Sequence, residues 1–153
     1  MIKGTISEKK QKSLYEQDYH LWLITTANQL EENNIQDLDI HNLLEEIESM
    51  GRSEKNGLQS NLQIVLMHLL KYKYQPEKRS NSWRYTILEH RDRIAITLEN
   101  SPSLKSYVGE IFDKCYQKAR KKAATETGLP LNKFPSDSPF TIENTLNEDY
   151  LPE

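Results

Sequence analysis

The 153-residue sequence lacks most of the features that would identify an enzyme, a secreted protein or a membrane protein. Its single cysteine, Cys115, excludes a disulfide framework and a cysteine-based zinc site within one chain. No segment approaches the roughly 18 apolar residues that cross a bilayer, and the lysine-rich start has no apolar core like that of a signal peptide. Glycine-rich phosphate loops, His-Glu-x-x-His and Gly-x-Ser-x-Gly are also absent. We therefore expect a cytoplasmic protein with no cofactor, and the sequence argues against an enzyme.

Charge of both signs is plentiful but unevenly distributed. Charged residues make up 28% of the chain and the net charge is −3, which gives no overall attraction to nucleic acid. Residues 31–54 contain eight acids and one base, whereas residues 71–93 contain seven bases and three acids. Residues 114–122 add five bases without an acid. These basic stretches are typical of phosphate contacts, although a solvated face or one half of a dimer interface gives the same pattern.

An apolar stripe with helical spacing runs through residues 39–75. Apolar side chains recur about every 3.6 residues, and the phase does not reset at either glycine in the segment. We predict one helix of about 54 Å, with Asp39 as its N-cap and Pro76 ending it. The stripe consists of Ile40, Leu43, Leu44, Ile47, Met50, Leu58, Leu62, Val65, Leu66, Leu69 and Tyr72.

The rest of the chain predicts further helices and no strand, because no segment alternates with period two. Ser80 or Ser82 would cap the third helix, and the two Ser-Pro pairs would start the last two. Short connections make neighbouring helices antiparallel. The predicted fold is an all-α antiparallel bundle of four main helices plus a short C-terminal helix, built around the long second helix. A mobile tail over 1–13 would precede a single helical domain over 14–153, whose other helices are 16–32, 80–98, 101–127 and 138–146.

Two glycines within the long helix lead to a further prediction. Each costs a helix about 0.5–1 kcal/mol relative to alanine, so their presence suggests a bend or a close backbone approach. Gly51 falls on the inward side beside Ile47 and Met50, and we expect Gly51→Leu to destabilise the fold by crowding. Gly57 faces outward more, and Gly57→Ala is expected to be neutral or stabilising.

Six blocks of sequence occur in an order that resembles a known family. They are Leu43–Gly51, His68–Lys71, Gln75–Pro76, Ser82–Trp83, Ser101–Leu104 and Glu126–Pro130. From about Tyr15 to Pro152 the chain resembles the domain of unknown function 29 family, an uncharacterised bacterial family frequent in cyanobacteria. The resemblance implies an all-helical fold and carries no activity to transfer. Family members often have cysteine where this chain has Ser138, so a thiol-based role there would not hold.

Hairpin geometry predicts a polar cluster at one end of the bundle. With the second turn centred near Lys78 and Arg79, the imidazoles of His68 and His90 would lie at the same level. Histidine carries protons near neutral pH, and arginine with tyrosine holds anions. The alternative is that these are core residues with satisfied polar atoms. The candidate ligand-binding residues are His68, Lys71, Trp83, His90, Arg91, Tyr116 and Arg120.

A second candidate site lies near the start of the long helix. His41, Glu45 and Glu48 are spaced i, i+4, i+7, so they share a face on which a histidine and carboxylates could bind a divalent metal. The di-iron helical pattern, however, needs Glu-x-x-His on two helices, and none occurs. Acids near a helix start are also favoured by the helix dipole. We assign no metal and keep these three residues only as a candidate.

Three functions stay open from the sequence. The leading one is a non-enzymatic helical interaction module that binds a protein partner or self-associates, because the long helix outruns its neighbours and leaves a surface for a partner. The first alternative is a small-ligand or anion pocket, catalytic or not, around His68, Trp83, Tyr116 and Arg120. The second alternative is a nucleic-acid-binding accessory protein. A membrane partner is not expected.

Overall fold

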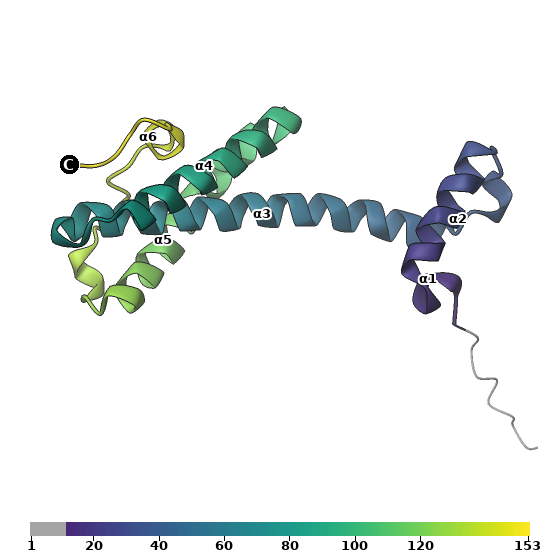
Figure 1. Ribbon diagram of the computed structural model, residues 1–153, viewed down its shortest axis with the longest axis horizontal. Helices are drawn as coiled ribbons and strands as arrows, with labels where there is room; N and C mark the ends of the chain where they lie inside the picture. Colours follow the sequence, from purple (N-terminus) through teal and green to yellow (C-terminus); the bar gives the residue numbers. More distant parts are fainter. Residues whose placement is uncertain (1–11) are drawn as a thin grey trace, which may run out of the picture. The chain divides into compact units, whose positions relative to one another are not determined.

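The computed structural model describes residues 12–153, and these residues form helices joined by short turns without a strand (Figure 1). The predicted tail over 1–13 lies, apart from its last two residues, outside the described residues. The all-α prediction is confirmed. The α-helices are α1 (Leu14–Gln17), α2 (Tyr19–Glu31), α3 (Ile40–Tyr74), α4 (Asn81–Asn100), α5 (Lys105–Thr127) and α6 (Ile142–Leu146). Short 3-10 turns lie at η1 (Ile35–Asp37), η2 (Pro76–Lys78), η3 (Pro102–Leu104) and η4 (Leu131–Lys133). None of the described helices is long and apolar enough to span a bilayer.

The chain divides into two compact units, and the boundary falls within α3, between Met50 and Gly51. Unit 1 is described over residues 12–50 and contains α1, α2 and the start of α3. Unit 2 comprises residues 51–153 and contains the rest of α3 with α4, α5 and α6. Each unit is described by itself below.

Helix α3 has the bounds that its sequence predicts, to within one residue at each end. The Asp39 carboxylate accepts the Asn42 backbone N–H at 3.3 Å, and the Asp39 carbonyl accepts that of Leu43, so Asp39 caps the helix. The helix continues through both glycines and stops just before Gln75-Pro76. A Cβ added at Gly51 would meet no heavy atom within 4 Å, so the predicted crowding at this position is wrong.

Unit 2 holds the hydrophobic core, at the contact of α3, α4 and α5. His90 on α4 bonds to Asn61 on α3, and Arg79 bonds back to Tyr72, so α3 and α4 are antiparallel, as predicted. Cys115, Lys122 and Glu126 on α5 bond in the same order to Gln59, Gln63 and Lys71 on α3, and α5 therefore runs parallel to α3. The fully buried side chains of this core include Leu58, Leu62, Val65, Leu66, Leu69, Leu70, Ile87, Ile94, Cys115, Tyr116, Ala119 and Phe134.

The predicted helix starts at the serines are correct only where the serine hydroxyl accepts a backbone N–H of the helix. Ser80 caps α4 as predicted, because its Oγ accepts the Trp83 backbone N–H. The Ser101 hydroxyl instead donates to the Glu54 carboxylate at 2.6 Å, and Pro102 opens η3 rather than α5. The Ser138 hydroxyl bonds within its own turn to Phe140. The last helix consequently begins later than predicted, with Thr141 as its cap.

Candidate functional site

The seven residues of the predicted polar cluster all belong to unit 2, but the structure places six of them in three different environments and bonds the seventh, His90, to Asn61. The register of the α3–α4 hairpin accounts for part of the difference. His90 is bonded to Asn61, seven residues before His68, so the register of the hairpin differs from the predicted one, although His68 is still near enough to lower the pKa of His90. The prediction centred the turn near Lys78 and Arg79, whereas Arg79 already bonds back to the Tyr72 carbonyl and the 3-10 turn starts at Pro76.

The first environment brings together His68, Lys71 and Trp83. The Lys71 ammonium lies 4.6 Å from the centre of the Trp83 ring and donates to the Glu126 carboxylate at 2.7 Å. Lys71 is only 5% exposed, whereas the Glu126 side chain is 51% exposed. The buried ammonium is thus held by one carboxylate and one aromatic face, which is the pairing that a buried cation needs. Glu126 was not predicted as a member of this cluster.

Both histidines of the cluster are held by protein atoms. His68 Nδ1 donates to the Ile64 carbonyl at 2.9 Å, and His90 Nδ1 is bonded to Asn61 Oδ1 at 2.7 Å. Burial is the main cause that lowers the pKa of each imidazole below its ordinary value, and nearby cations lower it further. Both rings therefore favour the neutral form near pH 7. Each ring has one anchored nitrogen, an arrangement typical of structural histidines.

Arg91 forms the second environment, in which it fixes the C-terminal segment. Its guanidinium donates to three backbone carbonyls, those of Asn144, Thr145 and Tyr150, at 2.8–3.1 Å. The side chain is 4% exposed. All three guanidinium nitrogens are used within the protein, so Arg91 has a structural role and does not present its charge to a ligand.

Tyr116 and Arg120 form the third environment, on α5. The Tyr116 hydroxyl donates to the Pro135 carbonyl and Arg120 Nε donates to the Phe134 carbonyl at 2.9 Å. Burial raises the pKa of Tyr116 to about 12, so the phenol stays neutral. These two residues hold the segment that follows α5, and they do not join His68 and Trp83 around a common cavity.

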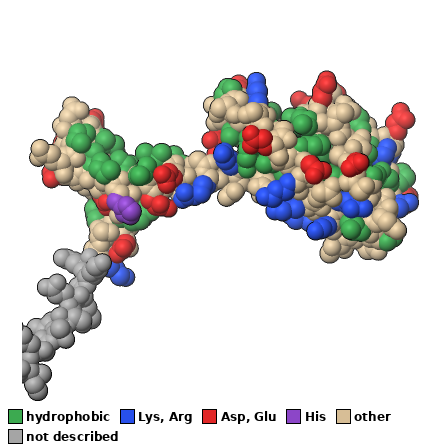
Figure 2. Space-filling view, turned by 180° about the vertical axis from the view of Figure 1, so that it is seen from behind, with side chains coloured by type: hydrophobic (Ala, Val, Ile, Leu, Met, Phe, Trp, Pro, Cys, Tyr) green, Lys and Arg blue, Asp and Glu red, His purple; other side chains and the backbone are tan. Residues whose placement is uncertain are grey.

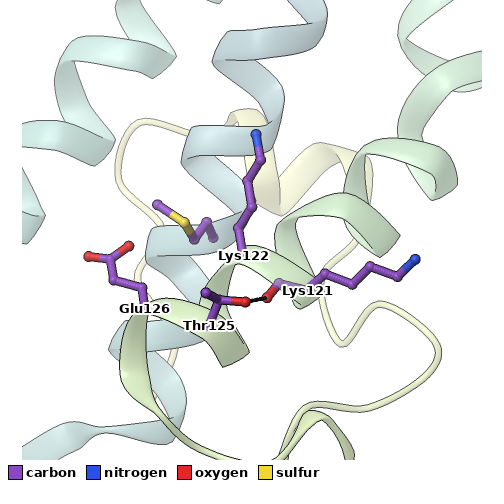
Figure 3. A pocket seen from close by; sticks show the side chains of 5 residues that line it. Lys121, Lys122, Thr125 and Glu126 are labelled. Atoms are coloured by element: carbon purple, nitrogen blue, oxygen red, sulfur yellow. Dashed lines mark hydrogen bonds between the residues drawn. The ribbon is translucent and has the colours of Figure 1, made fainter.

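A surface hollow of about 390 Å³ lies beside the first environment (Figure 3). Its floor is Met67, and its other lining residues, Lys121, Lys122, Thr125 and Glu126, are exposed. Lys122 donates to Gln63 and Thr125 donates to the Lys121 carbonyl, while Figure 3 shows the Glu126 and Lys121 side chains pointing in opposite directions. The hollow therefore lacks a converging set of polar groups of the kind that selects a small ligand.

The remaining sequence candidates have no chemical site around them in the described part of the chain. No three His, Cys, Asp or Glu side chains come together there in an arrangement that could hold a metal, and this includes His41, Glu45 and Glu48. Cys115 is fully buried in the core of unit 2. Burial raises the pKa of its thiol, which makes it a poor nucleophile.

Unit 1 contains a groove that the sequence reasoning missed. The groove has a volume of about 480 Å³ and lies between α2 and the start of α3. Its lining is almost entirely apolar and includes Leu23, Ala27, Leu30, Leu43, Ile47 and Met50. Met50 is 69% exposed and Ile47 is 58% exposed, and Figure 2 shows apolar side chains grouped over this unit.

Glu46 joins the helices that form the groove. Its carboxylate accepts the hydroxyls of both Tyr15 and Tyr19, at 2.5 and 2.7 Å. These bonds lower the pKa of Glu46 and, together with smaller electrostatic effects, raise the pKa of Tyr15 to about 12. The rings of Tyr15 and Tyr19 pack in turn on Trp22, which forms the floor. One carboxylate and three aromatic rings thus hold the two walls of the groove together.

The surface around the groove is strongly acidic. Residues 12–50 contain nine acids and one base, Lys12, which gives a net charge of −8 with neutral histidines. Residues 51–153 contain thirteen acids and sixteen bases, a net charge of +3. The acidic excess and the apolar groove therefore coincide in one 39-residue unit.

Comparisons with known proteins identify a family but no characterised relative. No curated protein and no solved structure matches the chain. The model of one family, described as "Domain of unknown function DUF29", matches residues 14–151. This match covers nearly the whole chain and confirms the resemblance drawn from the six sequence blocks. The chain belongs to the DUF29 family.

Proposed function

We propose that the protein is a non-enzymatic interaction module whose partner protein binds the apolar groove of unit 1. One observation carries the proposal: apolar side chains in unit 1 are largely exposed. Among residues 12–50 the only buried side chains are Trp22 and Thr26. Eleven large apolar residues in the same range are exposed: Leu14, Tyr19, Leu21, Leu23, Ile24, Leu30, Ile35, Ile40, Leu44, Ile47 and Met50.

The energetics of burial support this proposal. Full burial of a large apolar side chain is worth about 1.5–3 kcal/mol, so each half-exposed side chain leaves about 1 kcal/mol available to a partner that covers it. Contiguous apolar surface rimmed by polar residues is the usual mark of a protein interface. Unit 1 by itself therefore leaves apolar surface uncovered.

Site-specific photo-crosslinking in the producing cells tests the proposal. A photoreactive phenylalanine analogue at Ile47 should give an adduct of defined mass, because this side chain lies in the groove. The same analogue at Ile96, which is 50% exposed on unit 2, is the matched control and should give none. The absence of an adduct at Ile47, and equally at Leu23 and Met50, would make the proposal wrong.

A cytoplasmic location is part of the proposal. Cys115 is a free, buried thiol, which is usual for proteins of reducing compartments.

Binding of nucleic acid to α5 is a second candidate function, favoured by the five bases of residues 114–122. Two of these cations, Arg120 and Lys122, are already engaged in structural hydrogen bonds. Retardation of DNA or RNA that weakens steeply with salt would support this candidate, and none at low salt would remove it.

A further inference from the structure

We infer that the partner segment is a basic amphipathic helix that lies in the groove of unit 1. This inference rests on the proposed function and specifies the chemistry of the partner. It draws on two independent properties of unit 1: the spacing of the apolar residues on both walls and the charge around them.

The apolar residues on the two walls of the groove are spaced so that the apolar stripe of one further helix can pack between them. On α2 the lining residues Leu23, Ala27 and Leu30 are spaced i, i+4, i+7, and on α3 Leu43, Ile47 and Met50 repeat the same spacing. Each row extends about 10 Å at 1.5 Å per residue. Two such rows accept the apolar stripe of a third helix, the arrangement in which helical peptides occupy hydrophobic grooves.

The negative charge of unit 1 favours a positively charged helix in the groove. Glu31 lies on the flank of the α2 row by helical phase, and unit 1 carries a net charge of −8. Lysine or arginine on the polar face of the bound helix would face this field, whereas acids would be repelled. At about 0.1 M salt the screening length is about 10 Å, comparable to the length of the groove, so the attraction acts before contact.

A second copy of the chain fits this surface less well. Pairing two grooves would bring −8 against −8. The basic helix α5 has no exposed large apolar residue between residues 105 and 127 to fill the groove. Helix α4 exposes Tyr85, Leu88 and Ile96, but its three arginines are matched by three acids, so it lacks the basic excess. A basic amphipathic helix from another protein meets both requirements.

The test uses the full chain and three labelled peptides of about 18 residues, or five helical turns. The first has a leucine stripe on a lysine background, the second has the same stripe on a glutamate background, and the third has the composition of the first in scrambled order. Fluorescence anisotropy should show the first binding at least about tenfold more tightly than the other two. Raising NaCl from about 50 to about 300 mM should weaken this binding.

Protein variants locate the binding and separate its two components. Ile47→Ser should weaken binding of the lysine peptide by about tenfold through lost apolar contact, while Ile96→Ser should leave it unchanged. The double variant Glu31→Lys, Glu32→Lys should weaken it mainly at low salt. Both glutamates are exposed, so these substitutions do not disturb a core.

The possible failures distinguish this inference from the proposed function. Equal affinity for the lysine and glutamate peptides, or for the scrambled peptide, overturns the inference while leaving the interaction module intact. A dimer that Ile47→Ser dissociates would show that a second copy occupies the groove and would also overturn it. If no peptide binds, the inference is wrong. If, in addition, no crosslink forms at Ile47, the proposed function is wrong as well.

Discussion

Both units contain helices with an apolar stripe, but the stripe is buried in unit 2 and largely exposed in unit 1. In unit 2 the apolar stripe of α3 meets α4 and α5, and Leu62, Val65 and Leu66 are completely buried. In unit 1 the stripe of the same helix faces α2 across the groove, and Ile47 remains 58% exposed. Two helices cannot enclose an apolar stripe, because each presents one face to the other and leaves the flanks open. The comparison shows that periodicity predicts which face is apolar, while the number of neighbouring helices decides whether that face becomes core or surface.

The charged groups of the two units differ in the same way. Unit 2 turns some of its cations inward, where Arg91 and Lys71 bind carbonyls and a carboxylate of the same unit. Most acids of unit 1, by contrast, lie on the surface. Buried charge therefore stabilises the fold in unit 2, whereas in unit 1 the charge lies mostly at the surface. The five predictions below test this contrast, in order of decreasing effect.

Two matched truncations in α3 should give very different losses of stability. Leu66→Ala removes a side chain with no exposed surface and should lower the free energy of unfolding by about 2–5 kcal/mol. Ile47→Ala removes a side chain from the open groove and should change it by less than about 0.5 kcal/mol. Urea denaturation followed by circular dichroism measures both. Similar losses at the two positions would show that the groove is covered in the free protein.

Arg91→Ala should cost about 3 kcal/mol, because three buried or partly buried carbonyls lose their donors. The C-terminal segment should also become accessible to proteases, and cleavage within residues 140–153 is the most direct measurement. Arg91→Lys is the control and should recover only part of the stability, because an ammonium lacks the planar fork of a guanidinium. Unchanged protection of this segment in Arg91→Ala would contradict the structural role.

Amide hydrogen exchange rates should differ between the two units in the unsubstituted protein. Backbone amides in α2 should exchange about a hundredfold or more faster than those between Leu58 and Tyr72 of α3, because local opening of unit 1 exposes little additional apolar surface. Mass spectrometry of peptic peptides gives both rates in one experiment. Equal protection of the two regions would mean that unit 1 is as well packed as unit 2.

Replacing either partner of the Lys71–Glu126 pair should lower the free energy of unfolding by different amounts. Glu126→Gln leaves the buried ammonium without its carboxylate and should cost about 1–2 kcal/mol. Lys71→Met removes the charge, keeps most of the packing and should stay within about 1 kcal/mol of the parent. Thermal melts of the two variants decide the order. The reverse order would show that the ammonium itself stabilises the fold.

Alanine at the two glycines of α3 should give the smallest effect. Gly51→Ala and Gly57→Ala should each stabilise by about 0.5–1 kcal/mol, because a Cβ meets no heavy atom within 4 Å at either position. Calorimetry of the single variants measures the shift. A drop in the melting temperature for Gly51→Ala alone would restore the packing role that its sequence position first suggested.

The parts of the fold that depend on local chemistry could be predicted from the sequence. Asp39 and Pro76 delimit α3 because a cap and a proline act on their immediate neighbours. Gly128 ends α5 in the left-handed conformation that glycine adopts without strain. Ser101 does not cap α5 as predicted, because its hydroxyl bonds to Glu54, which lies 47 residues away and outside any local pattern.

The candidate site depended on contacts between residues far apart in the sequence, and the structure divides its predicted members among separate contacts. The polar cluster required the register of the α3–α4 hairpin, and the turn lies two or three residues earlier than predicted, which pairs His90 with Asn61. The roles of Arg91 and Tyr116 required the path of the chain after α5, for which the sequence gives little periodic signal. The groove residues Leu43, Ile47 and Met50 were correctly placed on one face of α3, but periodicity does not show whether that face is covered.

The position of Arg91 in the chain has a consequence for biosynthesis. Its carbonyl partners lie 53–59 residues later, so the ribosome must pass residue 150 before the guanidinium can bind all three of them. A nascent chain that stops before Asn144 would lack these three acceptors. Unit 2 should therefore reach its final packing only after residue 150 has left the ribosome, whereas the hairpin of unit 1 emerges before unit 2.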